Sequence, residues 1–277
     1  MSDPDSTFFR VERDGAVVRL VMNRPDKANG MTADFWTDLP RLMDALGRDE
    51  TVRVAIISGE GRHFTGGMDL AAFADVAKLF DNEPGRAAYA MRDLILKLQD
   101  AFNAIERARF PVIAAVHGAC IGAGIDMITA CDLRLSTSDA YFSIEEIHIG
   151  MAADVGTLQR LPKLIAPSVA AELAYTGRRF SAPEALSMGL LSQVLPDRDA
   201  LLGAAGALAR SIAAKSPLAI AGIKRNLAYA RDHSVADGLD YIATWNAGVL
   251  RGGELMAAIQ AKMAKSQAVF ADLLKAH

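Results

Sequence analysis

The stretch "PVIAAVHG", residues 111 to 118, has the composition of a β-strand that is buried on both faces, because it is short, apolar and rich in β-branched residues. Toward the N-terminus, apolar side chains recur at helical spacing from Met91 to Ile105. Before that helix, "VRVAIIS" (52 to 58) is a second strand of the same kind. Strand, helix and strand in this order predict an α/β fold with a parallel sheet.

The N-terminal part of the chain predicts a further strand and helix. "AVVRLVMN" (16 to 23) has β-type composition, and the Pro/Asp/Gly stretch that follows it is typical of a turn. Apolar residues then recur at helical spacing from Phe35 to Leu46, after a candidate N-cap at Thr32. Pro40 interrupts this helical pattern, because proline lacks the amide hydrogen that a helix interior uses.

The pattern changes near residue 198, after which it is almost wholly helical. No repeat of fixed period and no low-complexity linker separates the two parts. We therefore expect an α/β core over residues 1–197 and a helical C-terminal region over residues 198–277, which packs on the core or on a neighbouring subunit.

Composition excludes several classes of protein. Hydrophobic residues make up 51% and charged residues 23%, and the formal net charge is -3. This balance indicates a globular protein and gives no basic patch for nucleic acid or an anionic membrane. Cys120 and Cys131 are too few for a disulfide scaffold and suit a reducing compartment. With no targeting signal and no apolar run of roughly 20 residues, we expect a cytoplasmic protein with no membrane partner.

Two glycine-bearing turns follow strands, namely "FTGGMDL" (64 to 70) and "GACIGAGIDM" (118 to 127). Glycines at such places let the backbone turn tightly and bring its amide groups close to a ligand. If each turn opens a helix, free amides of both could converge on one oxygen as an oxyanion hole. The alternative is that both are only tight connections. The second turn departs from the G-x-G-x-x-G fingerprint, so NAD is not implied.

Three acids lie in unusual surroundings at Asp126, Glu146 and Asp154. Each has a structural explanation: Asp126 could complement a helix dipole, Glu146 could be a solvated loop residue, and Asp154 could cap a helix. Asp126 and Asp154, however, lie among small and apolar residues, which should raise a carboxyl pKa and keep it available for proton transfer.

The remaining candidate side chains predict little chemistry. The spacing of His63, His117 and His148 supports no Ser-His-Asp arrangement, and His148 is interpreted as a structural hydrogen-bonding residue. Cys120 is interpreted as a small buried hydrophobe. No His, Asp and Glu set has metal-ligand spacing, so we expect no metal.

Five segments together resemble a known family: "NRPDKANGM", "FTGGMDL", "HGACIGAGIDMITACDLRLST", "EIHIGMAADVGTLQRLP" and "AKSPLAIAGIKRNL". In this order they are similar to the motifs of the enoyl-CoA hydratase/isomerase (crotonase) superfamily, from about residue 15 to residue 250. The resemblance implies a crotonase-like ββα spiral core with a helical C-terminal trimerisation region, in a homotrimer or a homohexamer. It implies an acyl-CoA thioester as substrate and no separate cofactor, because coenzyme A is part of the substrate.

The resemblance also assigns roles to backbone groups. The thioester carbonyl would be held by the amides of Met68 and of Ala123, where the family commonly has glycine. Lys27 and Ala28 fall where the family grips the phosphates and adenine of coenzyme A. The substrate-binding residues assigned to the first glycine turn are Gly66, Gly67, Asp69 and Leu70.

The trio of acids, with "AADVGTLQRLPK" and "YARDHSVADGLDYIATWN" (229 to 246), resembles the Δ3,5-Δ2,4-dienoyl-CoA isomerases of this superfamily. Moving a 3,5-diene into 2,4 conjugation takes a proton from C2 and adds one at C6. Asp154 and Glu146 are the candidates for these two transfers, and Asp126 would orient Glu146 or hold its proton by like-charge repulsion. The alternatives are hydration of a trans-2-enoyl-CoA by Asp126 and Glu146, and a catalytically silent oligomeric scaffold or RNA-binding relative.

Overall fold

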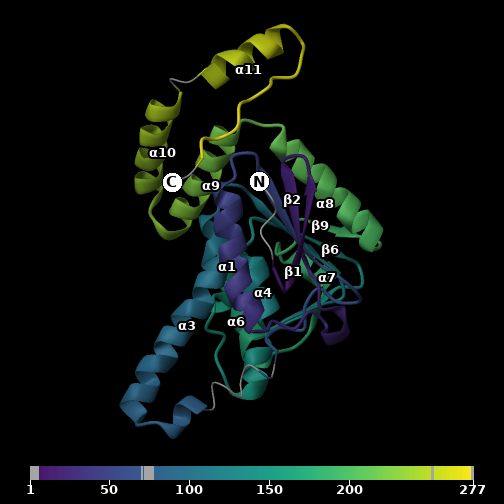
Figure 1. The fold of residues 1–277 in the computed structure, drawn as a ribbon, viewed down its shortest axis with the longest axis vertical. Helices are drawn as coiled ribbons and strands as arrows, with labels where there is room; N and C mark the ends of the chain where they lie inside the picture. Colours follow the sequence, from purple (N-terminus) through teal and green to yellow (C-terminus); the bar gives the residue numbers. More distant parts are fainter. Residues whose placement is uncertain (1–5, 70, 72–77, 251–252, 276–277) are drawn as a thin grey trace.

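The computed structural model of the chain describes residues 6–69, 71, 78–250 and 253–275. A six-stranded sheet has the order β1-β2-β3-β4-β6-β9, and a three-stranded sheet has the order β5-β7-β8 (Figure 1). The strands are β1 Phe9–Asp14, β2 Val17–Met22, β3 Val54–Gly59, β4 Val112–Val116, β5 Ala119–Ile121, β6 Leu133–Thr137, β7 Tyr141–Ser143, β8 Phe180–Ser181 and β9 Gln193–Leu195.

The centre of the large sheet is the parallel pair predicted from "VRVAIIS" and "PVIAAVHG". Strands β3 and β4 run parallel with Ile56 opposite Ile113, and every residue of both strands is buried. Only β1 pairs antiparallel in this sheet, as a hairpin with β2. Burial on both faces explains why these strands are continuous apolar runs without alternation.

Helices surround the sheets. They are α1 Ala33–Arg48, α3 Pro84–Arg107, α4 Ala123–Ala130, α5 Thr157–Arg160, α6 Pro167–Thr176, α7 Ala182–Ser187, α8 Arg198–Ala213, α9 Pro217–Asp232, α10 Val235–Val249 and α11 Gly253–Met263. Short 3₁₀ turns are η1 Pro25–Lys27, η2 Lys78–Asp81, η3 Glu145–Ile149 and η4 Leu161–Lys163. Helix α1 begins after Thr32, as expected, but continues through Pro40. Burial of its apolar face, including Leu39 and Leu42, outweighs the roughly 3 kcal/mol that an interior proline costs.

The large sheet is covered on both faces. Helices α1 and α3 belong to the main core on one face. On the other face, Leu201, Ala205 and Ala209 of α8 pack against side chains that include Val54 and Ile113. Their spacing of four residues puts them on one side of the helix. The first helix of the predicted C-terminal region therefore packs on the sheet, and the boundary at residue 198 stays a prediction.

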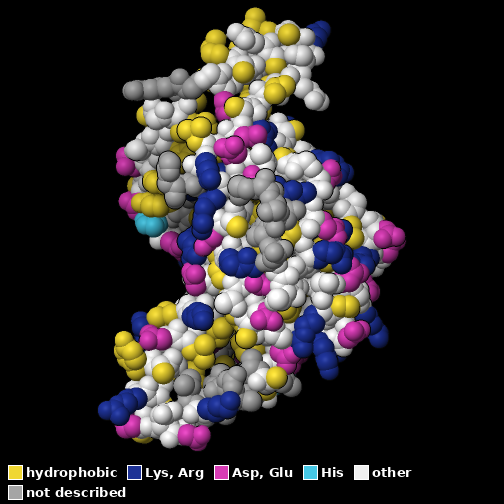
Figure 2. Space-filling model, in the orientation of Figure 1, with side chains coloured by type: hydrophobic (Ala, Val, Ile, Leu, Met, Phe, Trp, Pro, Cys, Tyr) yellow, Lys and Arg dark blue, Asp and Glu magenta, His cyan; other side chains and the backbone are white. Residues whose placement is uncertain are grey.

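Two helical parts extend from the body of the molecule. The N-terminal part of α3 projects at one end, and α10 with α11 project at the other (Figure 1). Hydrophobic side chains gather on the surface of both projections (Figure 2). Those exposed on α9 to α11 are Ile223, Leu227, Val235, Leu239, Leu255, Met256, Ile259 and Met263. Among the described residues, no helix combines the length and apolarity required to cross a membrane.

Candidate active site

The two glycine turns of the sequence lie against each other. Thr65 and Cys120 form a parallel bridge, and the Thr65 amide donates to the Ala119 carbonyl at 2.9 Å. Gly67 adopts a left-handed φ of 85°, and a Cβ built there would lie 2.9 Å from the Ile121 carbonyl oxygen and 3.6 Å from the Ala123 nitrogen. Glycine is thus required for this close approach.

The close approach leaves two amides without acceptors. Ala123 is the first residue of α4, so its amide has no partner within the helix. The Met68 amide lies between two residues that do bond to Met31: the Met31 amide donates to the Gly67 carbonyl, and the Asp69 amide donates to the Met31 carbonyl. Within the described part of the chain, neither the Met68 nor the Ala123 amide donates a hydrogen bond. Both amides are therefore free to donate to a ligand, and the oxyanion hole itself stays a prediction.

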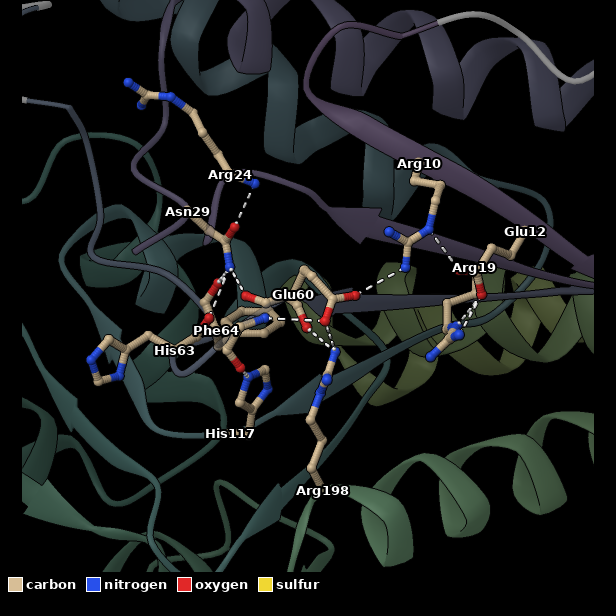
Figure 3. Close-up of polar contacts among 12 residues, drawn as sticks. Arg10, Glu12, Arg19, Arg24, Asn29, Glu60, His63, Phe64, His117 and Arg198 are labelled. Atoms are coloured by element: carbon tan, nitrogen blue, oxygen red, sulfur yellow. Dashed lines mark hydrogen bonds and ion pairs between the residues drawn. The ribbon is translucent and has the colours of Figure 1, made fainter. Parts of the chain in front are cut away.

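Asn29 holds the start of the first of these turns through its side-chain amide (Figure 3). It is fully buried, and its Nδ2 donates to the carbonyls of Glu60, His63 and Phe64 at 2.9, 2.8 and 3.1 Å. Its Oδ1 accepts from the Arg24 amide at 2.9 Å, so both ends of the side-chain amide are used. Asn29 was not among the predicted site residues. The signal for it is an asparagine before glycine in a turn, where a left-handed φ is tolerated.

The predicted coenzyme A-binding residues lie beside the same turn. Lys27 is exposed, and Ala28 follows it in the left-handed conformation at the end of η1. The Ala28 carbonyl accepts from the Gly66 amide at 2.7 Å, which joins the two segments. Asp69 pairs with Arg24 at 2.7 Å, and this bond lowers the pKa of the Asp69 carboxyl. Leu70 lies outside the described residues.

Asp126 lies in the first turn of α4 and is fully buried. Its Oδ1 accepts from the Thr157 amide at 2.5 Å, whereas its Oδ2 is buried and has no partner among the described residues. Burial raises the pKa of Asp126 to about 6, against the opposing effect of the Thr157 bond. The charge of Asp154 acts in the same direction as burial.

Glu146 lies at the start of η3, next to the N-terminus of α4. Its Oε1 would be 3.5 Å from a Cβ added to Gly122, the residue before Ala123, so the carboxyl group lies in van der Waals reach of the start of α4. Its Oε2 is buried and finds no hydrogen-bond partner in the described structure. Burial, and then the charge of Asp126, raise the pKa of Glu146 to about 7.

Asp154 lies in the loop before α5 and is partly buried, and burial raises its pKa. The alternative role as a helix cap does not hold, because the N-cap is Gly156 and the first amide of α5, that of Thr157, is bound by Asp126. The Asp154 carboxylate accepts no hydrogen bond from another described residue. Its main-chain carbonyl accepts from Gln99 Nε2 of α3 at 2.7 Å.

These observations bring the three acids together. Burial raises the pKa of Glu146, and the charges of Asp126 and Asp154 act in the same direction, so the three carboxyl groups interact electrostatically. Such carboxyl groups keep or exchange a proton near neutral pH, as general acids and bases must. The histidines lie elsewhere in hydrogen bonds with main-chain groups; for His148 this is Nε2 with the Gly177 carbonyl at 3.1 Å. No group of ligands for a metal is found among the described residues.

Comparison with known proteins agrees with the resemblance. The family model for enoyl-CoA hydratase/isomerase matches residues 12–245. A relative from Rattus norvegicus named Delta(3,5)-Delta(2,4)-dienoyl-CoA isomerase, mitochondrial, is 47% identical over 90% of this chain and 77% of its own length. A relative from Arabidopsis thaliana with the same enzyme name, peroxisomal, is 43% identical over 96% of both chains. The crystal structure of an enoyl-CoA hydratase from Bacillus anthracis has a TM-score of 0.87 at 27% identity and covers 96% of this chain and 99% of that one.

The names of these relatives correct one prediction. They place the relatives in mitochondria and peroxisomes, so the prediction of a cytoplasmic protein is wrong. A low cysteine count indicates only a reducing compartment, and composition does not distinguish one such compartment from another.

The crotonase-like fold and the family are confirmed by these comparisons. The model match spans most of the chain, and the motifs that carried the resemblance form the two glycine turns and the three-acid cluster. The chain belongs to the enoyl-CoA hydratase/isomerase family.

Proposed function

We propose that the protein is a Δ3,5-Δ2,4-dienoyl-CoA isomerase, which moves the double bonds of a 3,5-dienoyl-CoA into 2,4 conjugation. The names of the similar proteins from several organisms support this reaction. The observation that carries the proposal is the third acid. Asp154 interacts electrostatically with Glu146, and among the described residues its carboxylate accepts no hydrogen bond from another residue that would give it a structural role.

The reaction removes a proton from C2 and adds a proton at C6, with no net change in the substrate's atoms. Asp154 takes the C2 proton, and the electrons delocalise over the diene to the thioester oxygen. The amides of Met68 and Ala123 stabilise the negative charge on that oxygen. Glu146, protonated because its pKa is raised to about 7, delivers a proton to C6.

Asp126 serves this pair without touching the reacting carbons. Its charge disfavours ionisation of Glu146, so the donor stays protonated near neutral pH. Its Oδ1 also binds the amide of Thr157, three residues after Asp154, and thereby holds the loop that carries the base. The three acids titrate as a coupled set.

Coenzyme A binds along the first glycine turn. The exposed Lys27 offers its ammonium group to a phosphate, beside Ala28, and Gly66, Gly67 and Asp69 form the edge of the thioester site. Leu70, assigned to the same role by the resemblance, stays a prediction. The isomerisation needs no cofactor besides the coenzyme A of the substrate, because it transfers only protons and leaves the oxidation state unchanged.

The protein functions as a homotrimer or a homohexamer. The apolar side chains exposed on α9 to α11 support this assembly, since a contiguous apolar surface of this kind marks a protein interface.

Ultraviolet absorbance tests the proposal directly. Purified protein is incubated with a 3,5-dienoyl-CoA and, separately, with a trans-2-enoyl-CoA. Appearance of the conjugated dienoyl chromophore in the first reaction, much faster than loss of the enoyl band in the second, is expected of the isomerase. Hydration as fast as isomerisation would favour the hydratase alternative, and inactivity in both would favour the catalytically silent one.

A further inference from the structure

One face of α3 holds the loop that carries Asp154. Gln99, Asn103 and Glu106 are four and three residues apart, a spacing that puts them on the same side of the helix. Gln99 binds the Asp154 carbonyl, as described above. Asn103 and Glu106 bind the loop indirectly, through Arg160 at the end of α5.

Arg160 is buried, with 8% of its surface exposed, and its guanidinium points back along α5 toward the loop. Its Nη2 donates to Asn103 Oδ1 at 2.6 Å and to Glu106 Oε2 at 2.8 Å. Its Nη1 lies 3.4 Å from the carbonyl of Val155, the residue after Asp154. The guanidinium is thus tied at one end to α3 and at the other to the backbone next to the base.

Gly156 shows how closely the guanidinium lies against the loop. A Cβ added at Gly156 would be 1.8 Å from Arg160 Nη1, and the glycine has a φ of 134°, which side chains rarely adopt. The sequence around Asp154 therefore makes room for Arg160. A surface arginine paired only with an exposed acid would require no such accommodation.

The charges around Arg160 extend to the C-terminal region. Glu106 also pairs with Arg231 of α9, and Arg231 pairs in turn with Asp232. These residues, with Lys163, line a cavity of about 290 Å³ that reaches Gly156. Arg160 lies in α5 three residues after Thr157, whose amide binds Asp126. Burial raises the pKa of Asp126, and the positive charge of Arg160 opposes the rise.

We propose that Arg160, held by Asn103 and Glu106, is a positioning residue for the reaction, which fixes the backbone of Asp154 and supplies positive charge beside Asp126. This inference rests on the proposed function. Arg160 contacts no substrate atom in this role. A lysine at this position would keep the positive charge. It would lose the planar guanidinium group, which binds two acceptors on α3 and the backbone of the loop at the same time.

The test compares kcat, KM and the pH profile of kcat for Arg160→Met and Arg160→Lys with those of a control variant, Lys163→Met. The control removes a cation that lines the same cavity but pairs with Asp232. We expect Arg160→Met to lower kcat at least tenfold with KM within threefold, and to displace the pH profile of kcat, because the ionisation of Asp126 changes and is coupled to that of Glu146. Arg160→Lys should restore the pH profile but only part of kcat. Lys163→Met should keep both within twofold.

An Arg160→Met protein with the parent's kcat and pH profile would overturn the inference. A pH profile of Arg160→Lys that differs from the parent's would also overturn it. If Arg160→Met does not fold, Asn103→Leu takes its place, because it removes one acceptor of the guanidinium from a partly buried position. It should lower kcat threefold or more, and an unchanged kcat would overturn the inference.

The parent protein's activity separates this inference from the proposed function. A parent that hydrates and does not isomerise contradicts the proposed function, yet the ratio of variant to parent can be read on hydration. If the parent is inactive, the pH dependence of unfolding replaces the rate. Loss of the charge beside Asp126 should steepen the fall in stability between pH 5 and pH 8, and an unchanged slope would overturn the inference.

Discussion

Replacement of Asp126 by asparagine should remove a pH-dependent loss of stability and impair the reaction. Asp126 is fully buried, its Oδ2 has no donor within the described residues, and burial raises its pKa from the ordinary 3.8 to about 6. The folded protein therefore holds the proton more tightly than the unfolded chain. Stability from this group falls as pH rises from about 4 to about 6, and the full penalty applies above that window.

The magnitude follows from the two pKa values. A shift from 3.8 to about 6 corresponds to a penalty of about 3 kcal/mol at pH 8 and about 1.6 kcal/mol at pH 5. Asparagine removes the charge and can still accept the Thr157 amide. An unpaired amide group in place of Oδ2 adds a cost of about 1–3 kcal/mol, which does not depend on pH. The advantage of Asp126→Asn over the parent should therefore grow by about 1.4 kcal/mol from pH 5 to pH 8.

Urea unfolding at pH 5, 6, 7 and 8 measures this difference, at one protein concentration because subunit association would contribute to stability. Asp93→Asn, at an exposed position of α3, is the control and should show no such trend. A difference between Asp126→Asn and the parent that stays constant with pH, or that falls toward pH 8, would refute the reasoning that the ionised Asp126 is a burden on the fold.

The remaining predictions concern the other acids and the first glycine turn. Asp154→Asn should lower kcat for isomerisation by roughly 10²- to 10⁴-fold with little change in affinity for the thioester, and a rate within threefold of the parent would remove Asp154 from the mechanism. In deuterated water, Glu146→Gln should still exchange the C2 hydrogens of a dienoyl-CoA without forming product, whereas Asp154→Asn should lose the exchange; survival of exchange and turnover in both would contradict the two-acid mechanism. The parent's kcat should fall as pH rises above about 7, because Glu146 must be protonated to donate, and a constant rate from pH 6 to pH 9 would exclude that role. Asn29→Gly keeps the left-handed backbone but removes the donor to three carbonyls, so it should lower the free energy of unfolding by about 1–3 kcal/mol and kcat at least tenfold; an unchanged kcat would show that the Met68 amide does not depend on it.

The fold could be predicted where local pattern and burial agree. Strands β3 and β4 are apolar along their whole length because both faces are covered, and this is visible in the sequence. Pro40 wrongly indicates an interruption of the helix, because its unfavourable effect is local and visible in the sequence. The packing of α1 that offsets this effect depends on contacts with distant parts of the chain, which the sequence pattern does not show. The role of α8 against the sheet is likewise a matter of tertiary contacts.

The candidate site could be predicted only in part. Asp126 and Asp154 stood out because acids among apolar residues are costly unless they are used. The hydrogen bond from the Thr157 amide to Asp126 joins residues that are 31 positions apart in the sequence, so no local sequence pattern predicts it. Gln99, Asn103 and Glu106 are harder still, since polar residues on one side of a helix ordinarily indicate a solvated face. Here that face is turned toward Arg160 and the loop of Asp154.

The three acids differ in burial and in the hydrogen bonds that their carboxyl oxygens accept. This difference explains why each has a separate role. One oxygen of Asp126 is bound by a backbone amide, which favours its charged form despite full burial. Glu146 has a buried oxygen with no donor among the described residues and the negative charge of Asp126 nearby, so it is the acid that most resists ionisation. Asp154 is the least buried, and only its backbone is tied down. The reaction requires one acid that keeps its proton until it donates and another that is ionised and accepts a proton, so the two acids must differ in pKa. Removing the charge of Asp126 should reduce this difference in pKa without removing any contact with the substrate.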